Sequence, residues 1–234
     1  MGDPAEFDAG AFKDLLREHG LGISAINSGG IQYKLNAALV DNDARKAEYA
    51  LDKLKHNIRH CQAVGCLQQV GVARGFAVRG RPMRWYRDCL VAVLKEAVTY
   101  AARLQVEMVL EYTNRCDINT INTGAEARDI VDRVGHDNLG ILIDTGHSFL
   151  EDPDVCQNIQ DLRDYVRHFH LHDSNGGAAM IGGGENDFDR IIENCGLIGY
   201  RRWFSDGLFT VKYTDEELRR STHGLRQLYE KHGI

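Results

Sequence analysis

The sequence has few of the features that mark exported, membrane-bound or linker-rich proteins. It holds only three prolines in 234 residues, and no low-complexity segment divides it. Its six cysteines form no C-x-x-C pair, which favours reduced intracellular thiols over a disulfide framework. No apolar run approaches the roughly 18 residues of a membrane span, and the start MGDPAEFDAG lacks the regions of a signal peptide. We therefore expect a cytoplasmic protein, with no membrane partner, that forms a single domain over residues 1–234.

Excess positive charge and nucleotide-binding motifs are also lacking. The formal net charge is -6, so phosphate contacts with a nucleic acid have no bulk electrostatic support. A cluster of arginines between residues 79 and 87 is interpreted as a solvated loop and helix start. No G-x-G-x-x-G follows an expected strand, and IGGGEN at 181–186 lacks the preceding strand and the lysine of a phosphate loop. We expect no nucleic-acid partner and read 181–186 as a loop.

Short apolar runs alternate along the chain with longer amphipathic segments. The apolar runs predict strands at 21–26, 67–73, 106–112, 139–144, 168–173 and 202–206. The amphipathic segments predict helices at 41–63, 85–104, 126–134, 161–166, 188–194 and 215–232. Strict alternation of six strands with helices predicts an α/β fold with a parallel sheet, either closed as a (β/α) barrel or open and doubly wound.

Polar residues stand at the carboxyl ends of the later expected strands. Glu111, Asp144, His170 and Asp206 each lie at or near such an end. One acidic residue there is usually a helix cap or a salt-bridge partner, but the pattern recurs on consecutive strands. In a (β/α) barrel these ends converge on one mouth, where active sites lie. Carboxylates with an imidazole predict a divalent-metal site, suited to Mn, Mg, Co, Fe or Zn without a choice among them.

Three histidines alternate along the strand expected at 168–173. His168, His170 and His172 share one face, and Phe169 and Leu171 share the other. A row of histidines that points into a barrel is costly unless a polar partner or a metal satisfies it. The alternation therefore supports a metal site at this strand.

Four segments of the chain carry recognisable motifs. They are 110–152, with E-x-x-N-R followed by D-T-x-H, HFHLHDSN at 168–175, GGENDFDRII at 183–192 and EHGLGISAIN at 18–27. They resemble the sugar isomerase/epimerase family that has the xylose-isomerase-like barrel, which shows the first two motifs, then an H-x-x-D-N segment, a G-x-G-x-x-D-F helix start and an early hGL strand. Because they are ordered and cover nearly the whole chain, they indicate the family more strongly than they indicate a substrate.

The resemblance implies roles for individual residues. It implies three metal ligands: Glu111, Asp144 and His170. Arg115 would reach the polar end of a sugar-like substrate, and His147 would hydrogen-bond a substrate hydroxyl. Asp117 falls where ketose 3-epimerases of the family carry a glutamate that contacts the substrate. We expect a small carbohydrate-like substrate and a divalent metal (Mn, Mg, Co or Zn).

Two departures from the family pattern stand out. The family's barrel has eight strands, and its first strand, first helix and second strand have no counterpart here. We therefore expect a TIM-type barrel that is incomplete at the N-terminus, with about six of eight strands and free edges that favour a homo-oligomer. The family's fourth ligand is a glutamate, whose position holds Gly207. Asp206 lies one residue earlier. Since a one-residue slip reverses the facing, Asp206 serves as fourth ligand only if a bulge or a shortened turn restores it.

Three functions remain open at this point. The first is an isomerase or epimerase in which the metal stabilises an enediolate, with Glu111 and Asp206 exchanging the proton as catalytic residues. The alternative is a lyase of the inosose- or dehydroshikimate-dehydratase type, or one that cleaves C-glycosides, which needs one base. There His147 or His172, both also expected to bind substrate, would serve as acid or base. The second alternative is a truncated, catalytically inactive barrel.

Overall fold

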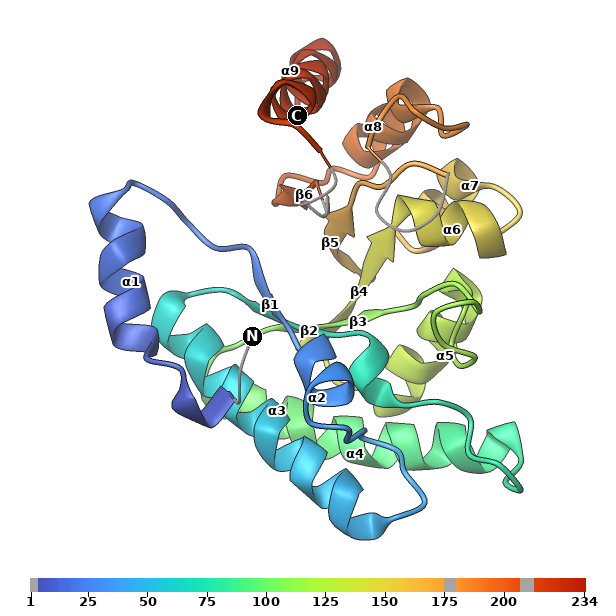
Figure 1. Cartoon of the computed structure of the whole chain (residues 1–234). Coiled ribbons are helices and arrows are strands. Elements are labelled where there is room, and N and C mark those ends of the chain that lie inside the picture. The colour runs from blue at the N-terminus through green and yellow to red at the C-terminus, as the bar shows by residue number, and fades with distance from the viewer. Residues whose placement is uncertain (1–3, 175–179, 207–212) are drawn as a thin grey trace.

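Six parallel strands form the centre of the molecule. The computed structural model describes residues 4–174, 180–206 and 213–234. The strands are β1 (Ala25–Asn27), β2 (Leu67–Val70), β3 (Met108–Glu111), β4 (Leu139–Asp144), β5 (Val166–His170) and β6 (Phe204–Ser205). They are hydrogen-bonded in chain order, each parallel to the next, and the sheet curls into a half-barrel (Figure 1). The expected incomplete (β/α) barrel with six strands is thereby confirmed.

Helices connect the strands and cover the outer side of the sheet. They are α1 (Ala9–Glu18), α2 (Gly29–Tyr33), α3 (Ala44–Val64), α4 (Met83–Arg103), α5 (Gly124–Val134), α6 (Thr145–Glu151), α7 (Val155–Asp161), α8 (Phe188–Leu197) and α9 (Asp215–His232), with short 3-10 turns η1 (Pro4–Glu6) and η2 (Val72–Arg74). Local chemistry sets several ends: Thr123 and Glu126 form a capping box at the start of α5. In the described ranges, we find no helix long and apolar enough to cross a membrane.

One predicted helix, at 161–166, is wrong. Helix α7 ends at Asp161, and Val166 already begins β5. Ile159, Leu162 and Val166 have helical spacing and are all buried, but they lie in a helix, a turn and a strand. Because apolar residues at this spacing are typical of an amphipathic helix, the sequence predicted one continuous helix here. The first and fifth predicted strands are also displaced by a few residues, as β1 covers 25–27 and β5 covers 166–170.

The interior strands are buried on both faces. Every residue of β3 and β4 is buried, as expected for a parallel sheet enclosed by helices on one side and by its own curl on the other. Helices α3, α4 and α5 pack side by side outside it (Figure 1). The two edge strands approach each other across the opening of the half-barrel, where Ser24 Oγ and Ser205 Oγ lie 3.2 Å apart.

Candidate functional site

The carboxyl ends of β3, β4 and β5 bring three of the predicted ligands together. Glu111, Asp144 and His170 are the last residues of these strands, and the sheet register pairs Asp144 with His170. His170 Nδ1 lies 3.1 Å from Glu111 Oε1 and 3.7 Å from Asp144 Oδ2. The two carboxylates are buried. Residues 26 or more positions apart in the chain thus form one polar cluster because parallel strands end on the same side.

Asp144 also begins the next helix. Its Oδ1 accepts hydrogen bonds from the backbone N–H of Gly146 at 2.9 Å and of His147 at 3.0 Å, which caps α6. Its Oδ2 faces the histidines instead, 2.5 Å from His172 Nδ1 and 4.0 Å from His147 Nε2. One carboxylate therefore fixes the start of α6 and directs its other oxygen into the cluster.

The cluster holds opposite charges close together in a buried place. Burial alone would raise the pKa of Asp144, but the charge of His147 and hydrogen bonds from His170 and His172 hold it well below its usual range. Burial likewise opposes ionisation of Glu111, yet the hydrogen bond from His170 lowers its pKa. Burial would lower the pKa of His170, but hydrogen bonds to Asp144 and Glu111 raise it to about 10. Without a metal, the carboxylates are therefore ionised around a protonated imidazole.

These side chains fit a divalent cation. One ligand atom each of Glu111, Asp144 and His147 lies within 4.8 Å of the others. Two carboxylates and an imidazole suit Mn, Mg, Co or Zn. The cation would replace the proton that His170 carries, since a metal-binding imidazole must be neutral. Both His147 and His170 are therefore placed to supply the nitrogen ligand.

His147 is the residue whose proximity to the ligands the sequence interpretation missed. It was predicted to bind substrate, and to serve as acid or base in the lyase alternative, whereas the structure also places it within reach of Asp144 and Glu111. The signal was present in D-T-x-H: a histidine three residues after a helix-capping aspartate lies one turn into the helix, on the same side as the cap.

Two residues in and directly after β2 contact the Glu111 carboxylate. Gln69 Nε2 donates to Glu111 Oε2 at 2.7 Å. Gly71 lies against the same oxygen, since a Cβ there would be 2.5 Å from it. Both residues belong to the apolar run predicted as a strand, where the sequence showed no sign of a contact with Glu111.

The loop after β3 places two further predicted residues near the cluster and turns a third away. Asp117 Oδ2 lies 4.0 Å from His147 Nε2 and accepts a hydrogen bond from Asn114 Nδ2 at 2.9 Å. Arg115 instead lies exposed and pairs with Glu151, with Nε 2.8 Å and Nη2 2.6 Å from Glu151 Oε2. Arg115 can therefore make the predicted substrate contact only if it leaves Glu151. Asp117 and His172, in contrast, already face the cluster.

Asp206 lies apart from the other predicted ligands. Ser205, which precedes it, hydrogen-bonds His168 Nε2 at 2.8 Å inside the half-barrel. Asp206 Oδ2 accepts a hydrogen bond from Ser221 Oγ of α9 at 2.9 Å, and burial raises its pKa. The opposite facing agrees with strand alternation. Gly207 lies outside the described residues, and the role of Asp206 as fourth ligand or second base stays a prediction.

The glycine-rich stretch at 181–186 forms a loop bound to Asp173. Asp173 Oδ2 accepts hydrogen bonds from the backbone N–H of Gly182 at 2.9 Å and of Gly184 at 2.8 Å. Asn186 Nδ2 donates to the carbonyl oxygen of His172 at 3.1 Å. This loop therefore supports the backbone from which His172 projects.

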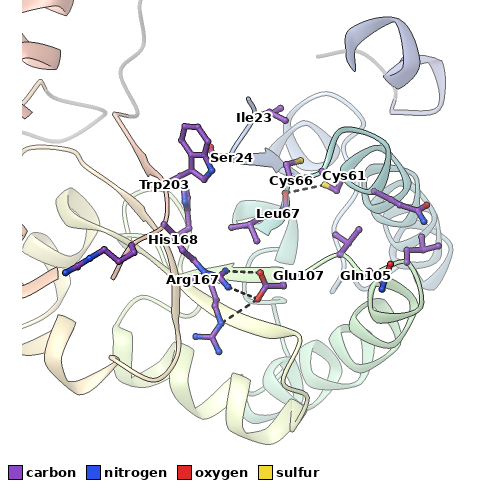
Figure 2. A pocket seen from close by; sticks show the side chains of 16 residues that line it. Ile23, Ser24, Cys61, Cys66, Leu67, Gln105, Glu107, Arg167, His168 and Trp203 are labelled. Atoms are coloured by element: carbon purple, nitrogen blue, oxygen red, sulfur yellow. Dashed lines mark hydrogen bonds and ion pairs between the residues drawn. The ribbon is translucent and has the colours of Figure 1, made fainter. Parts of the chain in front are cut away.

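A separate cavity of about 580 Å³ opens at the amino-terminal ends of the strands (Figure 2). Glu107 lies in it between two arginines: Arg202 Nη1 is 2.8 Å from Glu107 Oε2, and Arg167 Nε is 3.8 Å from Oε1. Glu107 is thus paired with both arginines, and the cavity lies at the opposite ends of the strands from Glu111 and Asp144. The carboxyl-terminal cluster is therefore the candidate site.

Comparison with known proteins agrees with this location. The family model described as "Xylose isomerase-like TIM barrel" matches residues 2–230. A ketose 3-epimerase of Arthrobacter globiformis is 31% identical over 207 residues, which cover 85% of this chain and 67% of that protein. A solved L-ribulose 3-epimerase is 26% identical with a TM-score of 0.76, covering 94% of this chain and 73% of the other. The IolI protein, solved with a bound zinc atom, is 17% identical with a TM-score of 0.79, covering 97% and 84%, and shows the fold alone.

Proposed function

We propose a specific activity for this chain, which belongs to the xylose isomerase-like TIM barrel family and is a sugar isomerase/epimerase-like enzyme. The proposed activity is divalent-metal-dependent epimerisation of a small ketose. The observation that carries the proposal is the convergence of Glu111, Asp144 and the imidazoles of His147 and His170 at one mouth. The substrate class comes from the ketose and L-ribulose 3-epimerases to which the chain is similar.

The residues of the cluster have distinct tasks in this reaction. Glu111, Asp144 and His147 or His170 would hold a divalent cation, and such a cation would polarise the carbonyl of a ketose. Glu111, ionised and oriented by Gln69, removes the proton from the carbon beside the carbonyl. Asp117 and His147 lie at the mouth, where sugar hydroxyls would be bound.

Epimerisation also needs an acid on the opposite face of that carbon. Asp206 is the predicted group, and it would act only after leaving Ser221 Oγ for the cluster. Because the bond to Ser221 holds Asp206 away from the cluster, it favours a second candidate function. This function is β-elimination from a hydroxy-ketone, for which one base suffices. In that reaction Glu111 is the base and His172 supplies a proton to the departing hydroxyl, since it already lies beside Asp144.

Solvent exchange separates the two functions. The protein loaded with Mn²⁺ or Co²⁺ is incubated with ketoses in deuterated water, and in parallel with inososes. Deuterium in an intact epimer supports the epimerase, and loss of water supports the lyase. Asp206→Asn abolishes epimerisation if Asp206 is the second acid, whereas Ser221→Ala, the matched control, leaves that carboxyl in place. If no ketose exchanges with any of these metals, the epimerase proposal is wrong.

Metal content tests the remaining alternative, an inactive barrel. We expect purified protein to carry Mn, Mg, Co or Zn in elemental analysis, and Glu111→Gln and His170→Ala to lose it. Thermal unfolding gives a second reading, because a ligand that binds only the folded state raises the melting temperature. No metal in the protein, together with no thermal shift from any of the four, would support the inactive barrel instead.

A further inference from the structure

Arg74 is a fully buried guanidinium beside the candidate site. It is the last residue of η2, directly after β2, and its side chain has 0% exposure. Arginine is almost never buried to this extent unless its donors are paired. The turn that directs it inward depends on Gly75, which has φ +94° and whose added Cβ would lie 2.5 Å from the carbonyl oxygen of Val40.

The guanidinium joins the end of β3 to the loop that follows it. Nη1 donates to the carbonyl oxygen of Glu111 at 2.9 Å. Nη2 donates to Thr113 Oγ1 at 2.8 Å, to the carbonyl oxygen of Thr120 at 2.6 Å and to that of Ile121 at 3.0 Å. Nε donates to Thr120 as well, at 3.1 Å. One side chain thus holds both ends of this loop against the strand that ends in Glu111.

The loop in turn orients His147. Asn114 Nδ2 lies 2.9 Å from His147 Nδ1 and 2.9 Å from Asp117 Oδ2. The other nitrogen of the same ring, Nε2, lies 4.0 Å from Asp144 Oδ2. A continuous set of contacts therefore runs from Arg74 through the loop and Asn114 to the imidazole that faces the ligands.

We propose that Arg74 is a positioning residue for this site, which sets the loop carrying Asn114 and Asp117 relative to Glu111. The proposal rests on the proposed function. All four acceptors are uncharged oxygens, and they are bonded to three different nitrogens of the guanidinium. A lysine ammonium offers three donors from a single point and cannot span them, so Arg74→Lys keeps the charge and loses the geometry.

The test compares three variants of the metal-loaded protein. Arg74→Lys removes the branched guanidinium, and Thr113→Val removes one of its acceptors with little change of shape. Ile58→Val is a control at a buried position of α3. For each we measure kcat, KM for the ketose, thermal unfolding and amide hydrogen exchange of the loop, where Asp117 N–H and Ile118 N–H are bonded to Asn114 O. The variants retain all the predicted metal ligands.

We expect Arg74→Lys to lower kcat/KM by about 100-fold, because displacement of a positioned group by about 1 Å costs that much. Thr113→Val should lower it by about threefold, the effect of a single weakened hydrogen bond. Loop amides should exchange faster in both variants. Ile58→Val should lower the melting temperature while KM and kcat stay as in the wild type, which separates positioning from a general loss of stability.

Two results would overturn the proposal. The first is wild-type kcat/KM and loop exchange in Arg74→Lys; if that variant does not fold, the same result in Thr113→Val decides. The second is a loss of activity in Ile58→Val equal to that in Arg74→Lys. Failure of the proposed function looks different: the wild type itself then turns over no ketose, and the loop exchange of Arg74→Lys still tests whether the guanidinium holds the loop.

Discussion

A methyl group at Gly71 would collide with the carboxylate that the site depends on. The added Cβ would lie 2.5 Å from Glu111 Oε2, whereas ordinary contact begins at 3.4 Å, so the oxygen must move by 0.9 Å (3.4 minus 2.5). That movement also disturbs the 2.7 Å hydrogen bond from Gln69 Nε2. We expect Gly71→Ala to weaken Mn²⁺ binding by about 100-fold, or about 2.7 kcal/mol. The fold should persist, because the group that must yield is the end of a side chain.

Titration calorimetry with Mn²⁺ measures this effect, and circular dichroism monitors the fold. Gly30→Ala is the matched control, because its added Cβ meets no heavy atom within 4 Å. It lies in α2, where alanine should stabilise the helix by about 0.5–1 kcal/mol. Wild-type Mn²⁺ affinity in Gly71→Ala would refute the reasoning, and so would an equal loss of affinity in Gly30→Ala.

Two further predictions follow from the buried groups. The pKa of His170 is raised from 6.5 to about 10, so its stabilising contribution is complete below pH 6.5 and is lost as the pH rises toward 10. Urea unfolding with EDTA should therefore show stability falling over this range, and a flat profile would contradict the assignment. Phe169→Ala should lower the free energy of unfolding by about 3–5 kcal/mol, measured in urea, because this ring is fully buried against Tyr200 and Phe204. A loss below 1 kcal/mol would contradict that packing.

Local patterns in the chain were sufficient for the parallel sheet and for the neighbourhood of the site, while they left a closed barrel and an open sheet both possible. Six apolar runs that alternate with amphipathic segments predict a parallel sheet, and β4 lies at the predicted residues 139–144. Polar residues at the ends of consecutive runs predict that Glu111, Asp144 and His170 meet. Both predictions succeed because periodicity and strand direction depend on neighbouring residues alone, and parallel strands end on one side.

Only the tertiary structure decided which way the polar side chains point and which residues they contact. Asp206 lies at a predicted strand end but contacts Ser221 of α9, and Arg115 pairs with Glu151. Arg74 contacts Glu111 across 37 residues of chain. Such contacts depend on the register of β6, on the path of loops and on which helix packs nearby, and none of these leaves a periodic signal. The chain alone therefore determined where the chemistry gathers, and the packing of distant segments decided which side chains face it.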